Sequence, residues 1–194
     1  MDQFSLYFQI GREHILNLGM GLDHVLFVLA LAAGYLLSDW KKILVLVTAF
    51  TVGHSITLAL ATLNVIQVRT DVVEFFIVIT VLVTAISNLL QKGADSNSKI
   101  QRNYVYALFF GLIHGLGFSN TLRAILSKSQ GMLTPLFAFN VGLELGQIII
   151  VAIFLATGFL AVNLLGIDRR DWRMIISSAI AGISLMLIQD RFFW

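Results

Sequence analysis

The chain of 194 residues contains no cysteine and a single proline, and only 12% of its residues are charged. Because cysteine is absent, disulfides, thiolate metal ligands and cysteine nucleophiles are excluded, and a metal site would have to use imidazole, carboxylate, amide or backbone oxygen. Soluble domains carry about 25% charged residues, so the low share here excludes an ordinary water-soluble domain. A net charge of only +2 also argues against a nucleic-acid partner.

The sequence has long apolar runs instead, with 58% hydrophobic residues and a mean hydropathy of +0.87. Several runs exceed the roughly 18 residues needed to cross the hydrocarbon layer. The pattern predicts an all-α, polytopic helical bundle that forms one transmembrane domain over 1–194. An amphipathic segment at 1–18 is expected at the membrane interface, and the bundle is expected to fill 22–194. About six spans are predicted, at 22–37, 43–66, 72–90, 104–126, 134–165 and 174–187.

The basic residues predict the orientation of the spans, because cytoplasmic loops carry more Lys and Arg. The loops after the first, third and fifth spans hold eight of the 13 basic residues, and the termini with the other two loops hold five. We therefore expect both termini on the outer, periplasmic side of the membrane. The fifth span is longer than a perpendicular crossing needs, which predicts that it is tilted or broken.

Polar groups within the spans fall mostly at one depth. With a rise of 1.5 Å per residue along each helix, polar side chains of separate spans are expected in the outer half of the bilayer. All four histidines of the chain belong to this layer or border it, and two carboxylates join them. A charge at the bilayer centre costs roughly 2.5–3.5 kcal/mol, so such groups usually have a partner or a function. The predicted metal ligands are His14, Asp23, His24, His54, His114 and Glu144. Asn140, Gln147, Glu74 and Ser55 are predicted to support them.

Each of these residues also has a structural explanation. Asp23 could serve the first turn of its helix, where a carboxylate favours the dipole. A single histidine in a span could hydrogen-bond a neighbouring helix, and Glu144 could pair with Arg123. Glu74 could lie at the interface, and Asn140 could join two helices, as could Gln147. The shared depth favours a common site over these separate explanations.

Four blocks resemble the HupE/UreJ family of bacterial membrane proteins, and the likeness is greatest to its second branch. They read DHVLFVLAL from Asp23, FTVGHSITL from Phe50, FGLIHGLGF from Phe110 and FNVGLELGQ from Phe139. His14 followed by a glycine-containing spacer and Asp23-His24 is similar to the opening motif of the family. The resemblance implies nickel or cobalt transport and a multi-pass protein of the bacterial inner membrane.

The leading functional hypothesis is a permease or metal-binding membrane protein for Ni²⁺, Co²⁺ or Zn²⁺. Three histidines with a carboxylate could instead hold a catalytic zinc ion, so an intramembrane zinc-dependent hydrolase is the alternative. A haem-binding electron carrier, with His54 and His114 as axial ligands, is a third hypothesis. The expected partners are the metal ion and the lipid bilayer, and the oligomeric state, including a homo-oligomer, is left open.

Overall fold

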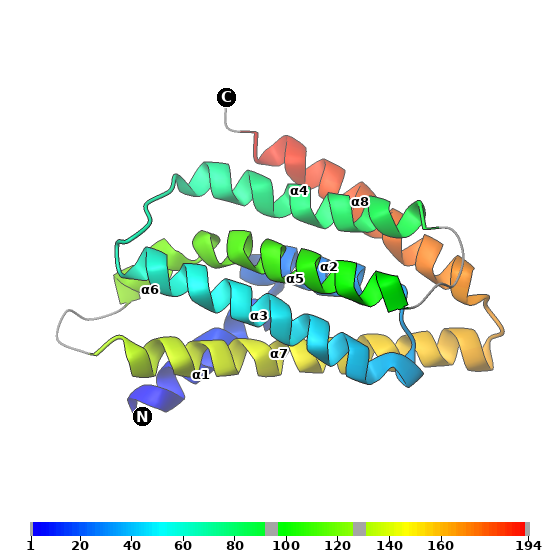
Figure 1. Cartoon of the computed structure of the whole chain (residues 1–194), viewed down its shortest axis with the longest axis horizontal. Helices are drawn as coiled ribbons and strands as arrows, with labels where there is room; N and C mark the ends of the chain where they lie inside the picture. The colour runs from blue at the N-terminus through cyan, green and yellow to red at the C-terminus, as the bar shows by residue number, and fades with distance from the viewer. Residues whose placement is uncertain (1, 92–96, 126–130, 193–194) are drawn as a thin grey trace.

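The computed structural model describes residues 2–91, 97–125 and 131–192, and within these ranges the chain is helical and has no strand. The elements are α1 (Gln3–Leu16), α2 (Leu18–Ala32), the 3-10 turn η1 (Leu37–Asp39), α3 (Trp40–Thr62), α4 (Thr70–Leu89), α5 (Asn97–Gly117), α6 (Ser119–Ile125), α7 (Leu133–Phe159), the π-helical turn η2 (Leu160–Leu164) and α8 (Arg169–Asp190). The long helices run side by side, with α3 and α5 between α7 and the α4–α8 pair (Figure 1).

Four segments are long and apolar enough to cross a membrane: Leu37–Thr62, Thr70–Leu89, Leu133–Leu164 and Arg169–Asp190. Two more qualify when each bent pair counts as one span. Gln3–Leu16 with Gly21–Ala32 bends by 68°, and Asn103–Gly117 with Ser119–Ile125 bends by 47°. The structure thus has four to six apolar spans, and the sixth requires α1, predicted at the interface, to join α2 in one bent span. The predicted all-α bundle is confirmed.

The bend between α1 and α2 is built around Asn17. Its backbone N–H donates to the Glu13 carbonyl and ends α1, while its side-chain oxygen accepts from the Gly19 N–H at 2.9 Å and begins α2. One residue thus caps two helices at the bend. The interfacial position predicted for 1–18 stays a prediction. The structure shows that α1 packs along α7 and buries Tyr7 and Ile15.

Glycines set the closest helix contacts. A Cβ atom on Gly53 of α3 would lie 2.2 Å from the Leu108 carbonyl oxygen of α5, and one on Gly111 would lie 2.2 Å from the Phe50 oxygen. In the α1–α7 pair, a Cβ on Gly11 would lie 2.0 Å from the Phe139 oxygen. Only glycine permits such an approach of two backbones, as in other membrane helix pairs.

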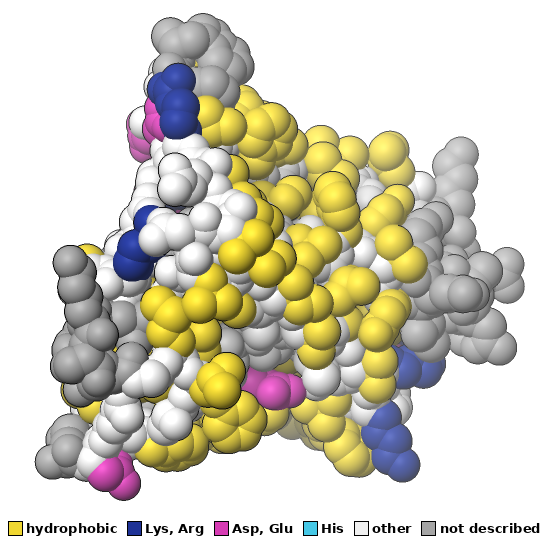
Figure 2. Space-filling view, turned by 60° about the vertical axis from the view of Figure 1, so that its left-hand side comes forward, with side chains coloured by type: hydrophobic (Ala, Val, Ile, Leu, Met, Phe, Trp, Pro, Cys, Tyr) yellow, Lys and Arg dark blue, Asp and Glu magenta, His cyan; other side chains and the backbone are white. Residues whose placement is uncertain are grey.

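The outer surface of the bundle is apolar across its middle. Figure 2 shows a band of hydrophobic side chains with Lys and Arg side chains on either side of it. Large hydrophobic side chains are exposed on four different spans, among them Val52 (47%), Phe76 (47%), Ile153 (62%) and Leu185 (59%). A surface of this kind is suited to lipid, and the chain is a membrane protein.

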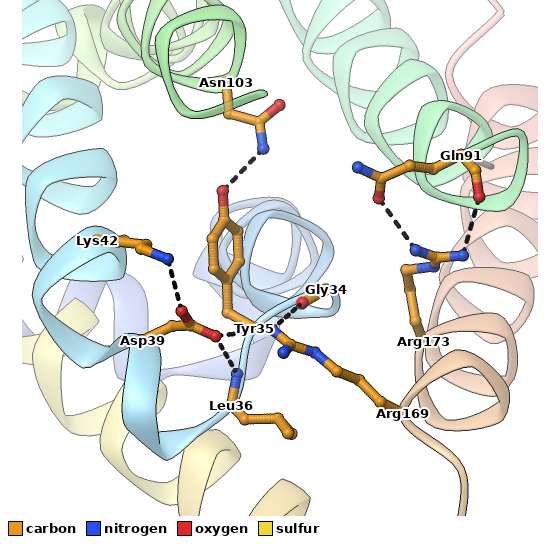
Figure 3. A network of polar contacts seen from close by, with 9 residues as sticks. All are labelled: Gly34, Tyr35, Leu36, Asp39, Lys42, Gln91, Asn103, Arg169 and Arg173. Carbon is orange, nitrogen blue, oxygen red and sulfur yellow. Dashed lines mark hydrogen bonds and ion pairs between the residues drawn. The ribbon is translucent and has the colours of Figure 1, made fainter. Parts of the chain in front are cut away.

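Polar contacts join the helices at the end of the bundle where α2, α4 and α7 finish (Figure 3). Asp39 accepts hydrogen bonds from Lys42 at 2.9 Å and Arg169 at 2.7 Å. Arg173 donates to both the side chain and the backbone carbonyl of Gln91, at 3.1 and 3.0 Å. We call this end, made of Gly34, Tyr35, Leu36, Asp39, Lys42, Gln91, Asn103, Arg169 and Arg173, the network end.

Candidate metal site

The four histidines come from four helices. His14 lies in the last turn of α1, His24 in α2, His54 in α3 and His114 in the last turn of α5. All four are buried, with 5% exposure for His14 and His24 and none for His54 and His114. The bend at Asn17 and the break after Gly117 allow the helices that carry His14 and His114 to end beside the cluster.

His24 is the centre of the cluster. Its ring centroid lies 4.8 Å from that of His14, 4.9 Å from that of His114 and 5.6 Å from that of His54. Imidazoles bind zinc through a nitrogen about 2.0–2.1 Å from the metal, which places the ring centroids of a tetrahedral site at about 5 Å from one another. The separations around His24 are of this size. The four imidazoles therefore lie close together around His24, and their role as metal ligands stays a prediction.

Phenylalanines surround the imidazoles. The ring of Phe118 lies 4.0 Å from His14, and Phe139 stacks on His54 with centroids 6.3 Å apart. Phe27 and Phe50 lie 5.2 and 5.1 Å from His114. These side chains offer no hydrogen-bonding group to the imidazoles, so the histidines are enclosed by apolar surface.

Among the described residues, seven of the eight imidazole nitrogens have no hydrogen-bond partner in the protein. The eighth, Nε2 of His114, lies 3.0 Å from the Thr80 hydroxyl of α4. A buried polar group left unpaired costs about 1–3 kcal/mol. Four imidazoles in one apolar enclosure are thus an expensive arrangement for structure alone, and their nitrogens are suited to bind a ligand.

The chemistry of this donor set fits Ni²⁺, Co²⁺ or Zn²⁺, which imidazole nitrogen binds well. In the part of the chain that the structure describes, however, no three His, Asp or Glu side chains are arranged to ligate one metal ion together. His24 meets the other rings edge to face, at interplanar angles of 73°, 86° and 70°. The rings would have to rotate to direct their nitrogens to a common centre.

The two carboxylates predicted as ligands contact other groups. Oδ2 of Asp23 accepts from Nη1 of Arg191 at 2.6 Å, which ties α2 to the end of α8. Oε1 of Glu144 accepts from the Thr48 hydroxyl at 2.8 Å, and both residues lie toward the outside of the α3–α7 contact. The alternative partner considered for Glu144, Arg123, instead donates to the Ala61 carbonyl. Ligand roles for Asp23 and Glu144 stay predictions.

The predicted supporting residues fall into two groups. Gln147 is fully buried and accepts from the Thr51 hydroxyl at 2.8 Å, so it joins α7 to the helix that carries His54. Asn140 and Ser55 bond to carbonyls of their own helices, at 2.8 and 2.6 Å. Glu74 is exposed on α4. Of these residues, Gln147 connects most directly to the histidine-bearing helices.

Two residues at the site were missed from the sequence. Thr80 is one of several polar residues on its span, and spacing along the chain does not indicate its contact with His114. Arg191 lies 168 positions from Asp23, and no local pattern joins them. The one available signal was that Arg191 and the intramembrane carboxylate Asp23 are expected at a similar depth.

The family model described as HupE / UreJ protein matches residues 1–193. The chain belongs to the HupE/UreJ family. The resemblance seen in four sequence blocks is thereby confirmed over nearly the whole chain of this HupE/UreJ protein. No curated protein and no solved structure matches it significantly.

Proposed function

We propose that this HupE/UreJ protein is a permease for a divalent transition metal ion, with Ni²⁺, Co²⁺ or Zn²⁺ as its cargo and the four imidazoles as the binding site. The observation that carries the proposal is the cluster around His24, in which four helices bring imidazoles together and leave seven of eight nitrogens without a protein partner. The family is associated with nickel and cobalt transport, which supports the same cargo.

The contact between Thr80 and His114 supports metal binding at a defined nitrogen. The Thr80 hydroxyl donates to the Ile77 carbonyl at 2.6 Å, so towards His114 it acts as acceptor of the Nε2 proton. The Nδ1 lone pair of His114 then remains for a metal ion. Hydrogen bonds of this kind commonly fix the tautomer and the orientation of metal-binding histidines.

We further propose that the protein lies in the bacterial inner membrane with both termini in the periplasm. The excess of Lys and Arg in the odd-numbered loops supports this orientation, which places the network end at the cytoplasm. The histidines lie nearer to the opposite end, because His114 is in the last turn of α5 and His24 in the first half of α2. An ion would then be captured from the periplasmic side.

No structural observation favours the other two hypotheses. A zinc hydrolase needs a carboxylate poised as a general base, whereas Asp23 is paired with Arg191 and Glu144 with Thr48. Axial haem ligands lie on opposite sides of a macrocycle. The two hypothetical ligands, His54 and His114, instead both pack against the ring of His24.

Metal loading of the purified protein tests the proposal. The protein in detergent is equilibrated with Ni²⁺, Co²⁺ or Zn²⁺ alone, freed of excess metal and analysed for its metal content. X-ray absorption at the metal edge then identifies the ligands. We expect retained metal with imidazole nitrogen neighbours in the unmodified protein, and none in His24→Ala.

Ser184→Ala is the matched control. Ser184 is also fully buried in a span, but its hydroxyl donates to the Ile180 carbonyl of the same helix, so its removal should leave metal content unchanged. Unmodified protein that retains no metal, or retains it without imidazole ligands, would overturn the proposal.

A further inference from the structure

The ion pair between Asp23 and Arg191 lies directly beside the histidine cluster. Asp23 precedes His24 in the chain, and the Arg191 guanidinium lies within electrostatic reach of both His24 and His114. The two side chains are 2.6 Å apart and only partly exposed, at 27% for Arg191 and 11% for Asp23. The ion pair therefore keeps the positive charge of the Arg191 guanidinium near the place where a cation would bind.

Only one oxygen of Asp23 is engaged by Arg191. The other, Oδ1, is buried and has no hydrogen-bond partner among the described residues. Carboxylate oxygens commonly accept several hydrogen bonds or bind a cation directly, so the single contact at Oδ2 leaves this carboxylate incompletely satisfied. It is placed both to pair with Arg191 and to accept an arriving ion.

Helix α8 brings Arg191 to this position, and α8 is the most loosely buried of the four long spans. Only 17% of its most apolar window is buried, compared with 39–56% in the other three. Its first turn is fixed at the network end, where Arg169 bonds to the Gly34 carbonyl and to Asp39. Its last turn is held by the Arg191–Asp23 pair and by the contact of Phe192 with Phe75 of α4.

We infer that Arg191 is a tethered cation that occupies the Asp23 carboxylate until a divalent ion displaces it. The inference rests on the proposed metal-transport function. When a metal ion enters the cluster, its charge repels the guanidinium and attracts the carboxylate, so the ion pair opens. Arg191 then returns to water at the end of the bundle, where part of its side chain is already exposed. Arg191 thus lowers the affinity of the site for the metal ion.

Direct titration with Ni²⁺, with Co²⁺ and with Zn²⁺, by calorimetry on the full-length protein in detergent, tests this role. In Arg191→Gln no ion pair has to be broken, so we expect metal binding to become about tenfold tighter, the scale of one partly buried ion pair. Arg191→Lys keeps a competing cation and should stay near the unmodified affinity. Arg191→Met replaces Arg191→Gln if the latter does not fold, because it keeps the apolar stem.

Arg169→Gln is the matched control, since it breaks an ion pair of the same kind at the other end of the same helix. We expect no change in metal affinity for this variant. In an Asp23→Asn background, Arg191→Gln should also have no effect, because the carboxylate for which metal and guanidinium compete is absent.

The outcomes separate the two proposals. Unmodified protein that binds none of the three ions overturns the proposed function. Unmodified protein that binds, together with an Arg191→Gln affinity equal to or weaker than that of Arg169→Gln, overturns the role of Arg191 alone. A gain that persists in the Asp23→Asn background also overturns it, since Arg191 would then act by repulsion without competing for Asp23.

Discussion

The two ends of the bundle differ in how far their polar groups are paired: the network end pairs most of them, although Nε of Arg173 and Nε1 of Trp172 have no partner among the described residues. At the network end, Asp39 accepts from a lysine, an arginine and the Leu36 N–H, and the Arg173 guanidinium meets two acceptors of Gln91. At the histidine end, seven of eight imidazole nitrogens meet no protein partner in the described chain. The contrast indicates that polar contacts join the helices at one end, while the other end keeps imidazole nitrogens unpaired, as the proposed metal site requires.

Tyr35 shows how the network end satisfies a buried group. Tyr35 lies in the loop between α2 and η1, and its hydroxyl accepts a hydrogen bond from the side-chain amide of Asn103 at 2.9 Å. Burial raises the pKa of the Tyr35 phenol, so the group is held in its neutral form. A neutral, hydrogen-bonded phenol suits a structural joint between helices.

The largest effect should come from separating the helices that carry His54 and His114. In Gly111→Val the side chain would collide with the Phe50 carbonyl, so we expect a loss of about 3 kcal/mol or more of unfolding free energy and no metal binding. Gly34→Ala is the control at the network end, where the nearest atoms are side-chain atoms 3.7 and 4.0 Å away. Denaturation in detergent measures both; equal stabilities would contradict the predicted backbone contact.

The next largest effect should be on transport. We expect His24→Ala to reduce uptake of radiolabelled nickel or cobalt by cells to background, because His24 contacts all three other imidazoles. His14→Ala should retain part of the uptake, since His24 is the only imidazole that His14 is shown to contact directly. Tyr35→Phe, at the network end, should transport at the normal rate when expression is matched. Full uptake by His24→Ala would show that the cluster is not on the transport path.

Removing Arg173 should affect stability without affecting metal binding. Arg173→Ala leaves two acceptors of Gln91 unpaired, and we expect a loss of about 2–3 kcal/mol of unfolding free energy. The metal affinity of the folded fraction should be unchanged, because the residue lies at the end opposite the histidines. Calorimetry beside thermal unfolding separates the two quantities, and a weakened affinity would refute the division of roles between the ends.

The smallest predicted effect concerns the orientation of one ring. Thr80→Val removes the acceptor for Nε2 of His114, and loss of such a contact typically weakens metal binding about 10–100-fold. Thr84→Val is the control, because the Thr84 hydroxyl bonds to the Thr80 carbonyl one turn away. Metal titration of both variants checks the prediction, which fails if they behave alike.

Much of the bundle could be predicted from the sequence, because hydrophobic length is a local property. The four long spans and the shared depth of the histidines follow from runs of apolar residues and a rise of 1.5 Å per residue. The corner at Asn17 was not predicted, since one asparagine at the edge of an apolar run does not by itself indicate a bend of 68°.

The carboxylates show where depth alone is insufficient. Glu144 lies at a depth similar to that expected for the histidines, yet it contacts Thr48 at the outside of two helices. The direction in which a side chain points depends on how its helix is rotated against its neighbours, and packing of distant segments sets that rotation. For the same reason Arg191 could not be assigned to Asp23 in advance.

The glycine contacts divide the cluster between two parts of the protein. At Gly53 and Gly111 the backbones of α3 and α5 meet closely, so His54 and His114 lie on one tightly packed helix pair. His14 and His24 belong to the α1–α2 corner, which Gly11 holds against α7. Any sliding of one unit past the other would split the four imidazoles into two pairs, and a bound ion would lose half of its ligands in one movement. For the proposed transport function, capture and release of the ion would then require only that shear, without unfolding either helix pair.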